Sequence, residues 1–220
     1  MFGKVIKNFP EQKIKKIKKN SLSAFEKLSN YLYFYFTNYA VMKKRILGVD
    51  PGTNILGYAV IEVENKTVQL LTLDVIKLGG LKSHFDRLNR IYTILSEVID
   101  RFEPQEMAIE APFYGKNPQS MLKLGRAQGV AIVAAMQKGL PVFEYAPLKI
   151  KMSITGNGRA SKEQVALMLQ SQIKGKFEYK YLDETDAVAA AVCHFYQNGS
   201  IGKSKGYSSW EDFARKNNLL

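Results

Sequence analysis

The hydrophobic pattern between residues 45 and 197 changes period several times, and this constrains the fold more than any other feature. Short apolar runs bounded by turn residues predict strands, whereas apolar residues spaced three and four apart predict amphipathic helices. Three strands come first, and the remaining strands alternate with helices. We therefore expect an α/β protein with a mixed five-stranded sheet, three antiparallel strands and then parallel crossovers, flanked by helices. The expected strands are 45–50, 57–63, 67–78, 106–110 and 141–145; the expected helices are 81–102, 117–138, 161–170 and 183–197.

Both ends of the chain lie outside this pattern. Residues 1–41 carry eight Lys and two Glu, which supplies half of the chain's net charge of +12. This segment is interpreted either as a basic arm that contacts phosphates or as an extension without native structure, because Met42 begins a run that looks like a natural start. We expect a non-conserved or disordered extension over 1–41, one domain over 42–198 and a basic tail over 199–220.

Charge, cysteine content and hydropathy limit the class of protein. The net charge of +12 favours a polyanionic partner, most simply nucleic acid, although charge alone is not specific. Cys193 is the only cysteine, so an intramolecular disulfide is excluded and a reducing cytoplasm is expected. No apolar run reaches the roughly 20 residues that span a bilayer, so no membrane association is expected.

Two acids follow apolar strands at the point where each strand ends. Asp50 closes the first strand before Pro51 and Gly52, and Glu110 ends the fourth strand before Pro112. A lone Asp at such a turn is often only a capping residue. Two acids at the carboxyl ends of neighbouring parallel strands, however, would meet at one edge of the sheet, where α/β proteins bind ligands.

A second pair of acids opens the last predicted helix. Asp183 and Asp186 are three residues apart and therefore share one helix face. Helix capping alone would explain them, at about 1 kcal/mol or less each. All four acids together would repel one another unless a hard cation bridged them, and all-oxygen ligation favours Mg²⁺ or Mn²⁺ over zinc.

Seven motifs occur in order over about 155 of the 220 residues, and together they are specific. This set strongly resembles the RuvC family of Holliday-junction resolvases, which belongs to the ribonuclease-H-like superfamily. The motifs are LGVDPG (47–52), GYAV (57–60), AIEAPFYGKN (108–117), LKLGRAQGVAIVAA (122–135), PVFEYAP (141–147), TGNGRASKEQV (155–165) and LDETDAVAAAVCH (182–194).

The resemblance implies a homodimeric endonuclease that nicks two opposed strands of a four-way DNA junction during recombination and DNA repair. It implies two Mg²⁺ ions per active site, with Mn²⁺ as an alternative, and the RuvA–RuvB branch-migration complex as a partner. Some family members have His at the position of Asp183. The implied catalytic residues are Asp50, Glu110, Asp183, Asp186 and Lys162, the four acids being the metal ligands, and the implied DNA-binding residues are Phe113, Lys116, Lys151 and Lys162.

Two of these residues can be interpreted from the sequence without the family. Lys162 follows Ser161 in the first turn of a helix, where backbone N–H groups favour an anion, but it could equally be an ordinary solvated lysine. Phe113 is a large apolar residue in a loop. Stacking on a base, worth about 1–3 kcal/mol, would explain it, and so would folding back over the core.

The second predicted helix is apolar over more than one stripe. This pattern indicates either a dimer interface or a well-buried helix. For an interface, a charge at Ala131 or Ala134 is expected to produce monomers. His84 and His194 lack the spacing of metal ligands and are expected to be structural.

Two other functions remain open at the level of sequence. An actin-like sugar kinase or ATPase also has an Asp-x-Gly turn after its first strand, but it needs a duplicated domain for which this chain is too short. A junction-binding protein without catalytic activity is the other alternative. The presence of all four acids argues against it, because acids repel phosphate.

Overall fold

The computed structural model describes residues 43–112, 117–175 and 177–199, and the chain divides after Met42. The described part is an α/β domain, as predicted. Its elements are β1 (Lys44–Asp50), β2 (Ile55–Glu64), β3 (Thr67–Lys77), α3 (His84–Phe102), β4 (Glu106–Glu110), α4 (Pro118–Gln137), β5 (Val142–Tyr145), α5 (Pro147–Thr155), α6 (Lys162–Gln172), β6 (Ile173–Lys174) and α7 (Leu182–Gly199).

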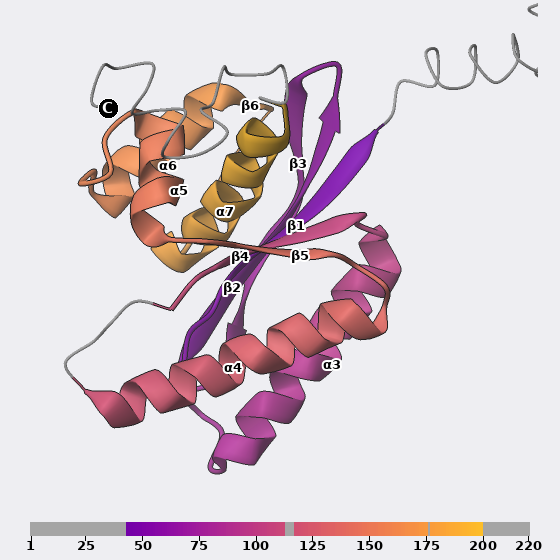
Figure 1. Cartoon of the computed structure of the whole chain (residues 1–220), viewed down its shortest axis with the longest axis vertical. Helices are drawn as coiled ribbons and strands as arrows, with labels where there is room; N and C mark the ends of the chain where they lie inside the picture. Colours follow the sequence, from indigo (N-terminus) through magenta and orange to yellow (C-terminus); the bar gives the residue numbers. More distant parts are fainter. Residues whose placement is uncertain (1–42, 113–116, 176, 200–220) are drawn as a thin grey trace, which may run out of the picture. The chain divides into compact units, whose positions relative to one another are not determined.

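The strands form one mixed sheet in the order β5-β4-β1-β2-β3-β6 (Figure 1). β1, β2 and β3 pair antiparallel, and β4 and β5 add parallel to β1, which confirms the predicted topology. The sheet has six strands in the described residues, so the predicted five was wrong. The additional strand, β6, has two residues that pair with β3 directly after α6, and two residues cannot produce a recognisable alternation.

The two faces of the sheet are covered by different helices. One core contains the inward side chains of α3 and α4, and the other contains those of α5, α6 and α7 (Figure 1). Successive residues of β1 divide between them, because Ile46 packs into the second core whereas Leu47 and Val49 pack into the first. Asp50 therefore lies on the same face as Ile46, which is the face covered by α7.

Local sequence signals explain where most elements begin and end. The predicted hairpin between β2 and β3 turns at Asn65 and Lys66, whose φ values of 50° and 64° suit a tight hairpin of the type that matches strand twist. Asn117 caps α4, and Ser161 forms a capping box with Gln164 at the start of α6. These caps place the two helix starts where the sequence predicted them.

Helix α5 was not predicted. It is nine residues long and its hydrophobic periodicity is weak, but Pro147 at its first position and Gly156 just past its end are ordinary boundary signals. This omission matters because α5 carries Lys151.

Helix α4 buries the side that was proposed for dimerisation. Ala131 and Ala134 are both 0% exposed and pack in the core with α3 and the sheet. The expectation that a charge there would report on a dimer interface was therefore wrong, because it would disrupt the core instead. The exposed apolar residues of α4 are Leu122, Val133 and Met136.

His194 is a structural residue, as predicted. It is fully buried on α7, with Nδ1 2.7 Å from the Tyr145 hydroxyl and Nε2 against the Glu106 carboxylate. His84 at the start of α3 has a buried Nε2 without a hydrogen-bond partner in the described part of the chain. Among the described helices, none is both long and apolar enough to cross a membrane.

Candidate active site

Asp50 and Glu110 meet at one edge of the sheet. β1 and β4 are parallel neighbours, and Val49 lies opposite Ile109 in the register, so the next residue of each strand is an acid. Both acids line one cavity, together with two residues of α4, Leu124 and Gln128. The prediction that these acids would be neighbours is confirmed.

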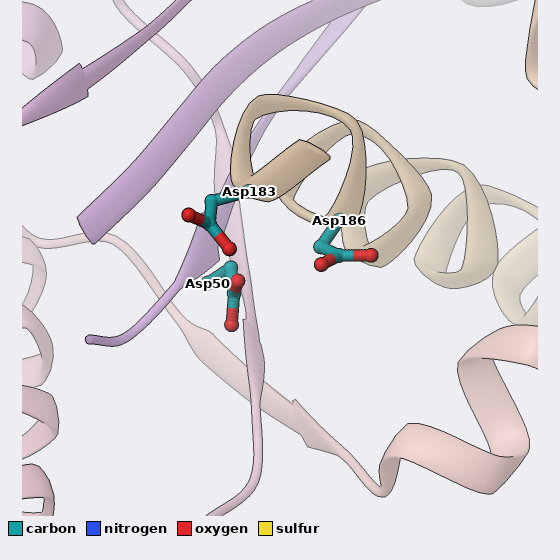
Figure 2. A group of neighbouring side chains, drawn as sticks. All are labelled: Asp50, Asp183 and Asp186. Carbon is teal, nitrogen blue, oxygen red and sulfur yellow. The ribbon is translucent and has the colours of Figure 1, made fainter. Parts of the chain in front are cut away.

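The opening turn of α7 brings Asp183 and Asp186 to the same edge. One carboxylate oxygen each of Asp50, Asp183 and Asp186 lies within 4.8 Å of the other two (Figure 2). Figure 2 shows Asp50 coming from the sheet and the other two from the first turn of the helix. Residues more than 130 positions apart in the chain thus form one acidic cluster. Below, "the acid cluster" means these three residues and Glu110.

Lys162 lies against the acid cluster. Its Nζ is 3.2 Å from Oδ1 of Asp183 and closer still to Oδ2 of Asp186. The capping box fixes the first turn of α6, so this lysine is held at the cluster by local structure as well as by charge. Sequence reasoning placed Lys162 near the DNA backbone but did not anticipate its contact with two acids.

The pKa values of the acids show how crowded the negative charge is. Burial and the neighbouring acids Glu110 and Asp186 raise the pKa of Asp50 well above its usual range. Burial, followed by the field of Asp186, raises the pKa of Glu110 to about 7. Burial also raises the pKa of Asp186, despite the hydrogen bond from Lys162. Burial works against the charge on Lys162, but Asp186, Asp50 and Asp183 outweigh it and raise its pKa.

This arrangement suits a divalent cation. Among the residues that the structure describes, two positive charges act on the four carboxylates: Lys162 contacts two of them, and the charge of Lys151 lowers the pKa of Glu110 and Asp186. The acids therefore keep an excess of negative charge. Their mutual repulsion disfavours ionisation, which is one reason why their pKa values are raised. Carboxylate oxygens at this spacing are the donor set that hard cations prefer.

Two predicted DNA-binding residues, Phe113 and Lys116, lie outside the described residues. Lys151 is half-buried on α5.

Gln128 was missed by sequence reasoning. It is buried, lines the cavity with Asp50 and Glu110, and donates a hydrogen bond from its side-chain amide to the Glu144 carboxylate over 3.2 Å. Its position four residues after Leu124, on the same face of α4, could have indicated that it lines the cavity.

The family model described as crossover junction endodeoxyribonuclease RuvC matches residues 46–194. That range contains the whole acid cluster. The chain belongs to the RuvC family.

Relatives named crossover junction endodeoxyribonuclease RuvC extend the match. The protein of Christiangramia forsetii is 54% identical over 173 residues, which is 78% of this chain and 90% of the relative. That of Bacteroides fragilis is 51% identical over 179 residues, 80% of this chain and 95% of the relative. The match therefore covers nearly the full length of both.

A solved structure of Thermus thermophilus RuvC in complex with a Holliday junction substrate superposes with a TM-score of 0.66 at 33% identity. It covers 70% of this chain and 94% of that one. The yeast mitochondrial Holliday junction resolvase Ydc2, at 14% identity and a TM-score of 0.53, shares the fold. RuvC enzymes depend on metal ions, which agrees with the acid cluster of this member.

Proposed function

We propose that this protein is a metal-dependent endonuclease that resolves Holliday junctions by nicking two opposed strands. The observation that carries the proposal is the acid cluster: the ends of β1 and β4 and the first turn of α7 bring its four acids together in a RuvC-family chain. The relative that was solved with a Holliday junction substrate supports four-way DNA as the substrate.

In this proposal Asp50, Glu110, Asp183 and Asp186 hold two Mg²⁺ ions, or Mn²⁺. Asp50 projects from β1 toward α7, near both Glu110 and the helix acids, so it would hold metal together with either group. The bound ions would supply an activated water and stabilise the leaving oxygen of the cut strand. Two of the carboxylates lie at the ends of paired strands and two on the first turn of a helix that packs on the sheet, so the fold itself positions them.

Lys162 has two successive roles in this proposal. Without metal and DNA its ammonium pairs with Asp183 and Asp186 and partly neutralises the cluster. If these carboxylates held metal, the Lys162 ammonium would no longer be needed to neutralise them and could contact the phosphate at the cut site. Nearly half of the side chain is exposed, which leaves room for this contact. Lys162 is thus proposed as both a catalytic and a DNA-binding residue.

The remaining DNA contacts are assigned to Lys151 on α5 and, by the family resemblance, to Phe113 and Lys116, which precede α4 in the sequence. Lys151 is close enough to Glu110 and Asp186 to influence the pKa of both, so a phosphate at the metal site would lie within its field. Phe113 is proposed to stack at the unpaired junction centre. Cytoplasmic location and a RuvA–RuvB partner are part of the same proposal.

The active unit is proposed to be a homodimer, because two symmetric cuts need two matching active sites. The outer face of α4 supports this idea. Leu122, Val133 and Met136 are 64%, 47% and 63% exposed. Gly125 and Gly129 lie between them, and a Cβ at either position would meet no atom of another described segment within 4 Å. Two glycines in a helix interior are destabilising by roughly 1 kcal/mol each, and the close approach of a second helix backbone would explain them.

Charged variants at the outer face test the dimer. Leu122→Glu and Met136→Glu should give monomers in analytical ultracentrifugation without loss of helical content, and should uncouple the two cuts. Ala131→Asp serves as the contrast, because it buries a charge and should unfold the domain. A wild-type protein that is monomeric at micromolar concentration would contradict the proposal.

Residues 1–41 are proposed to be dispensable for cutting. A protein that starts at Met42 should cleave junctions like the full chain at physiological salt, with at most a weaker dependence of binding on salt concentration. A large loss of cleavage would show instead that the basic extension takes part.

The function itself is tested on a synthetic four-way junction with Mg²⁺ or EDTA, beside a linear duplex of the same sequence. We expect symmetric nicks in the junction with Mg²⁺ only. Binding to the junction without any cutting under all metal conditions would favour the alternative of a non-catalytic binding protein.

A further inference from the structure

The opening turns of α7 lie unusually close to the sheet. All residues from Ala187 to Cys193 are buried at 1% exposure or less, and four of them are alanines. The helix contacts β1 and β2 directly, and these strands contribute Asp50 and its cross-strand neighbour. The height of α7 above the sheet therefore sets how far Asp183 and Asp186 are from Asp50.

Gly48 marks the first point of close approach. It lies on β1 two residues before Asp50, so both face α7. A Cβ built on Gly48 would be 2.0 Å from the backbone oxygen of Ala187 and 2.9 Å from Cβ of Ala191. A backbone oxygen cannot swing aside as the end of a long side chain can. Any larger residue here must push the helix away.

Gly57 marks the second point. It is the cross-strand partner of Asp50 on β2. A Cβ on Gly57 would be 2.1 Å from the backbone oxygen of Asp183, the first acid of α7. The two contacts involve helix residues four apart, so they support the turn that carries Asp183 and Asp186 at both of its ends.

Small displacements of this turn matter to a metal site. Ordinary van der Waals contact begins at 3.4 Å, so a methyl group at either glycine would require a shift of roughly 1.4 Å. Mg²⁺ requires near-ideal octahedral geometry with ligands at about 2.0–2.1 Å. A shift of this size would move the two acids on α7 away from Asp50 on β1.

We infer that Gly48 and Gly57 are positioning residues of the metal site: the absence of their side chains sets the distance between Asp50 and the two acids of α7. The inference rests on the proposed metal site. It assigns a function to two buried glycines that lie under α7.

The test is Mn²⁺ titration of the DNA-free full-length protein by calorimetry, with thermal unfolding measured in parallel. Gly48→Ala and Gly57→Ala should bind Mn²⁺ at least tenfold more weakly than wild type and should show a smaller rise in Tm on adding Mn²⁺. Junction binding in EDTA should stay at the wild-type level, which shows that the DNA surface is intact.

Two controls separate positioning from mere stability. Gly80→Ala adds a methyl group where nothing lies within 4 Å and should change neither property. Leu95→Ala opens the core on the opposite face of the sheet and should lower Tm without weakening Mn²⁺ binding. If one glycine variant does not fold, the Mn²⁺ affinity of the other variant tests the inference. If neither folds, Ala191→Val is used instead. It adds volume on α7 opposite Gly48 and is expected to weaken Mn²⁺ binding in the same way.

Two results distinguish failure of the inference from failure of the proposed site. Glycine variants with lowered Tm but wild-type Mn²⁺ affinity would overturn the inference, provided that Asp50→Asn abolishes binding. If Asp50→Asn also binds Mn²⁺ like wild type, the proposed metal site itself is wrong.

Discussion

Each end of β4 carries an acid on the same face of the sheet, but the charges around the two acids have opposite signs. Glu106 at the start lies against Lys44, 2.6 Å away, and His194. Burial opposes the charge on Glu106, but hydrogen bonds from Lys44 and His194 outweigh it and lower its pKa. Glu110 at the end lies among other acids, and its pKa is raised to about 7.

This contrast separates a structural acid, Glu106, from an acid, Glu110, that forms no ion pair with any residue in the described part of the chain. Glu106 has its positive partner within the fold, so its charge contributes to stability. The acid cluster has only part of the positive charge it needs, so the fold is less stable there without a cation. An unfavourable charge arrangement that the rest of the structure maintains is typical of a functional site.

The largest expected effect comes from removing one acid at the cluster end. Asp50→Asn should slow junction cleavage in Mg²⁺ by about 10³-fold, or ~4 kcal/mol, because metal ligation and water activation are lost together. Junction affinity in Ca²⁺ should hold or rise slightly, since a charge that repels phosphate is gone. Cleavage time courses beside gel shifts on one junction measure both. Cleavage at a near wild-type rate would remove Asp50 from the metal site.

The matched change at the other end of the sheet should have the reverse profile. Glu106→Gln removes the charge that pairs with Lys44 and that accepts from buried His194, so the free energy of unfolding should fall by about 1–2 kcal/mol. Cleavage at a temperature well below Tm should stay within about threefold of wild type. Chemical denaturation gives the first quantity. A loss of cleavage as large as that of Asp50→Asn would erase the distinction between the two ends.

The acid at the cluster end should make the stability depend on pH near neutrality. The folded protein raises the pKa of Glu110 from its ordinary 4.5 to about 7, so folding favours its protonated form. The associated stability is present below about pH 4.5 and is lost as the pH rises through about 7. In EDTA, Glu110→Gln should therefore gain stability relative to wild type between pH 5 and pH 8. Saturating Mg²⁺ should stabilise wild type more than the variant. A constant difference across this range would contradict the assignment.

The smallest effect is expected from Lys44→Gln. The side chain of Lys44 is one-third exposed, so its ion pair with Glu106 is screened by solvent and contributes about 0.5 kcal/mol. His194 still donates to Glu106 in this variant. Thermal unfolding at low and high salt measures the change, and salt should reduce the difference between variant and wild type.

Much of the fold could be predicted from the sequence because its signals are local. The hairpin at Asn65 and Lys66, the caps Asn117 and Ser161, and the antiparallel-then-parallel order follow from patterns of a few residues. Helix α5 was missed because it is short and lacks a side-chain cap at its start, and strand β6 because two residues are too few to alternate. The faces of α4 were misassigned for a related reason. Its apolar residues occur on more than one side, so sequence alone does not show that the stripe of alanines is the one that packs on the sheet.

By itself, the sequence determined which residues end strands or begin helices, and therefore which acids were available for a site. Only the tertiary structure decided that Asp50, Asp183 and Asp186 come within 4.8 Å, that Lys162 lies between two of them, and that Ala131 and Ala134 face inward. The hydrophobic period and the helix caps depend on residues that are close together in the sequence. Contacts between distant segments depend on how closely a helix can approach the sheet, and here that approach depends on the volume that two glycines leave free.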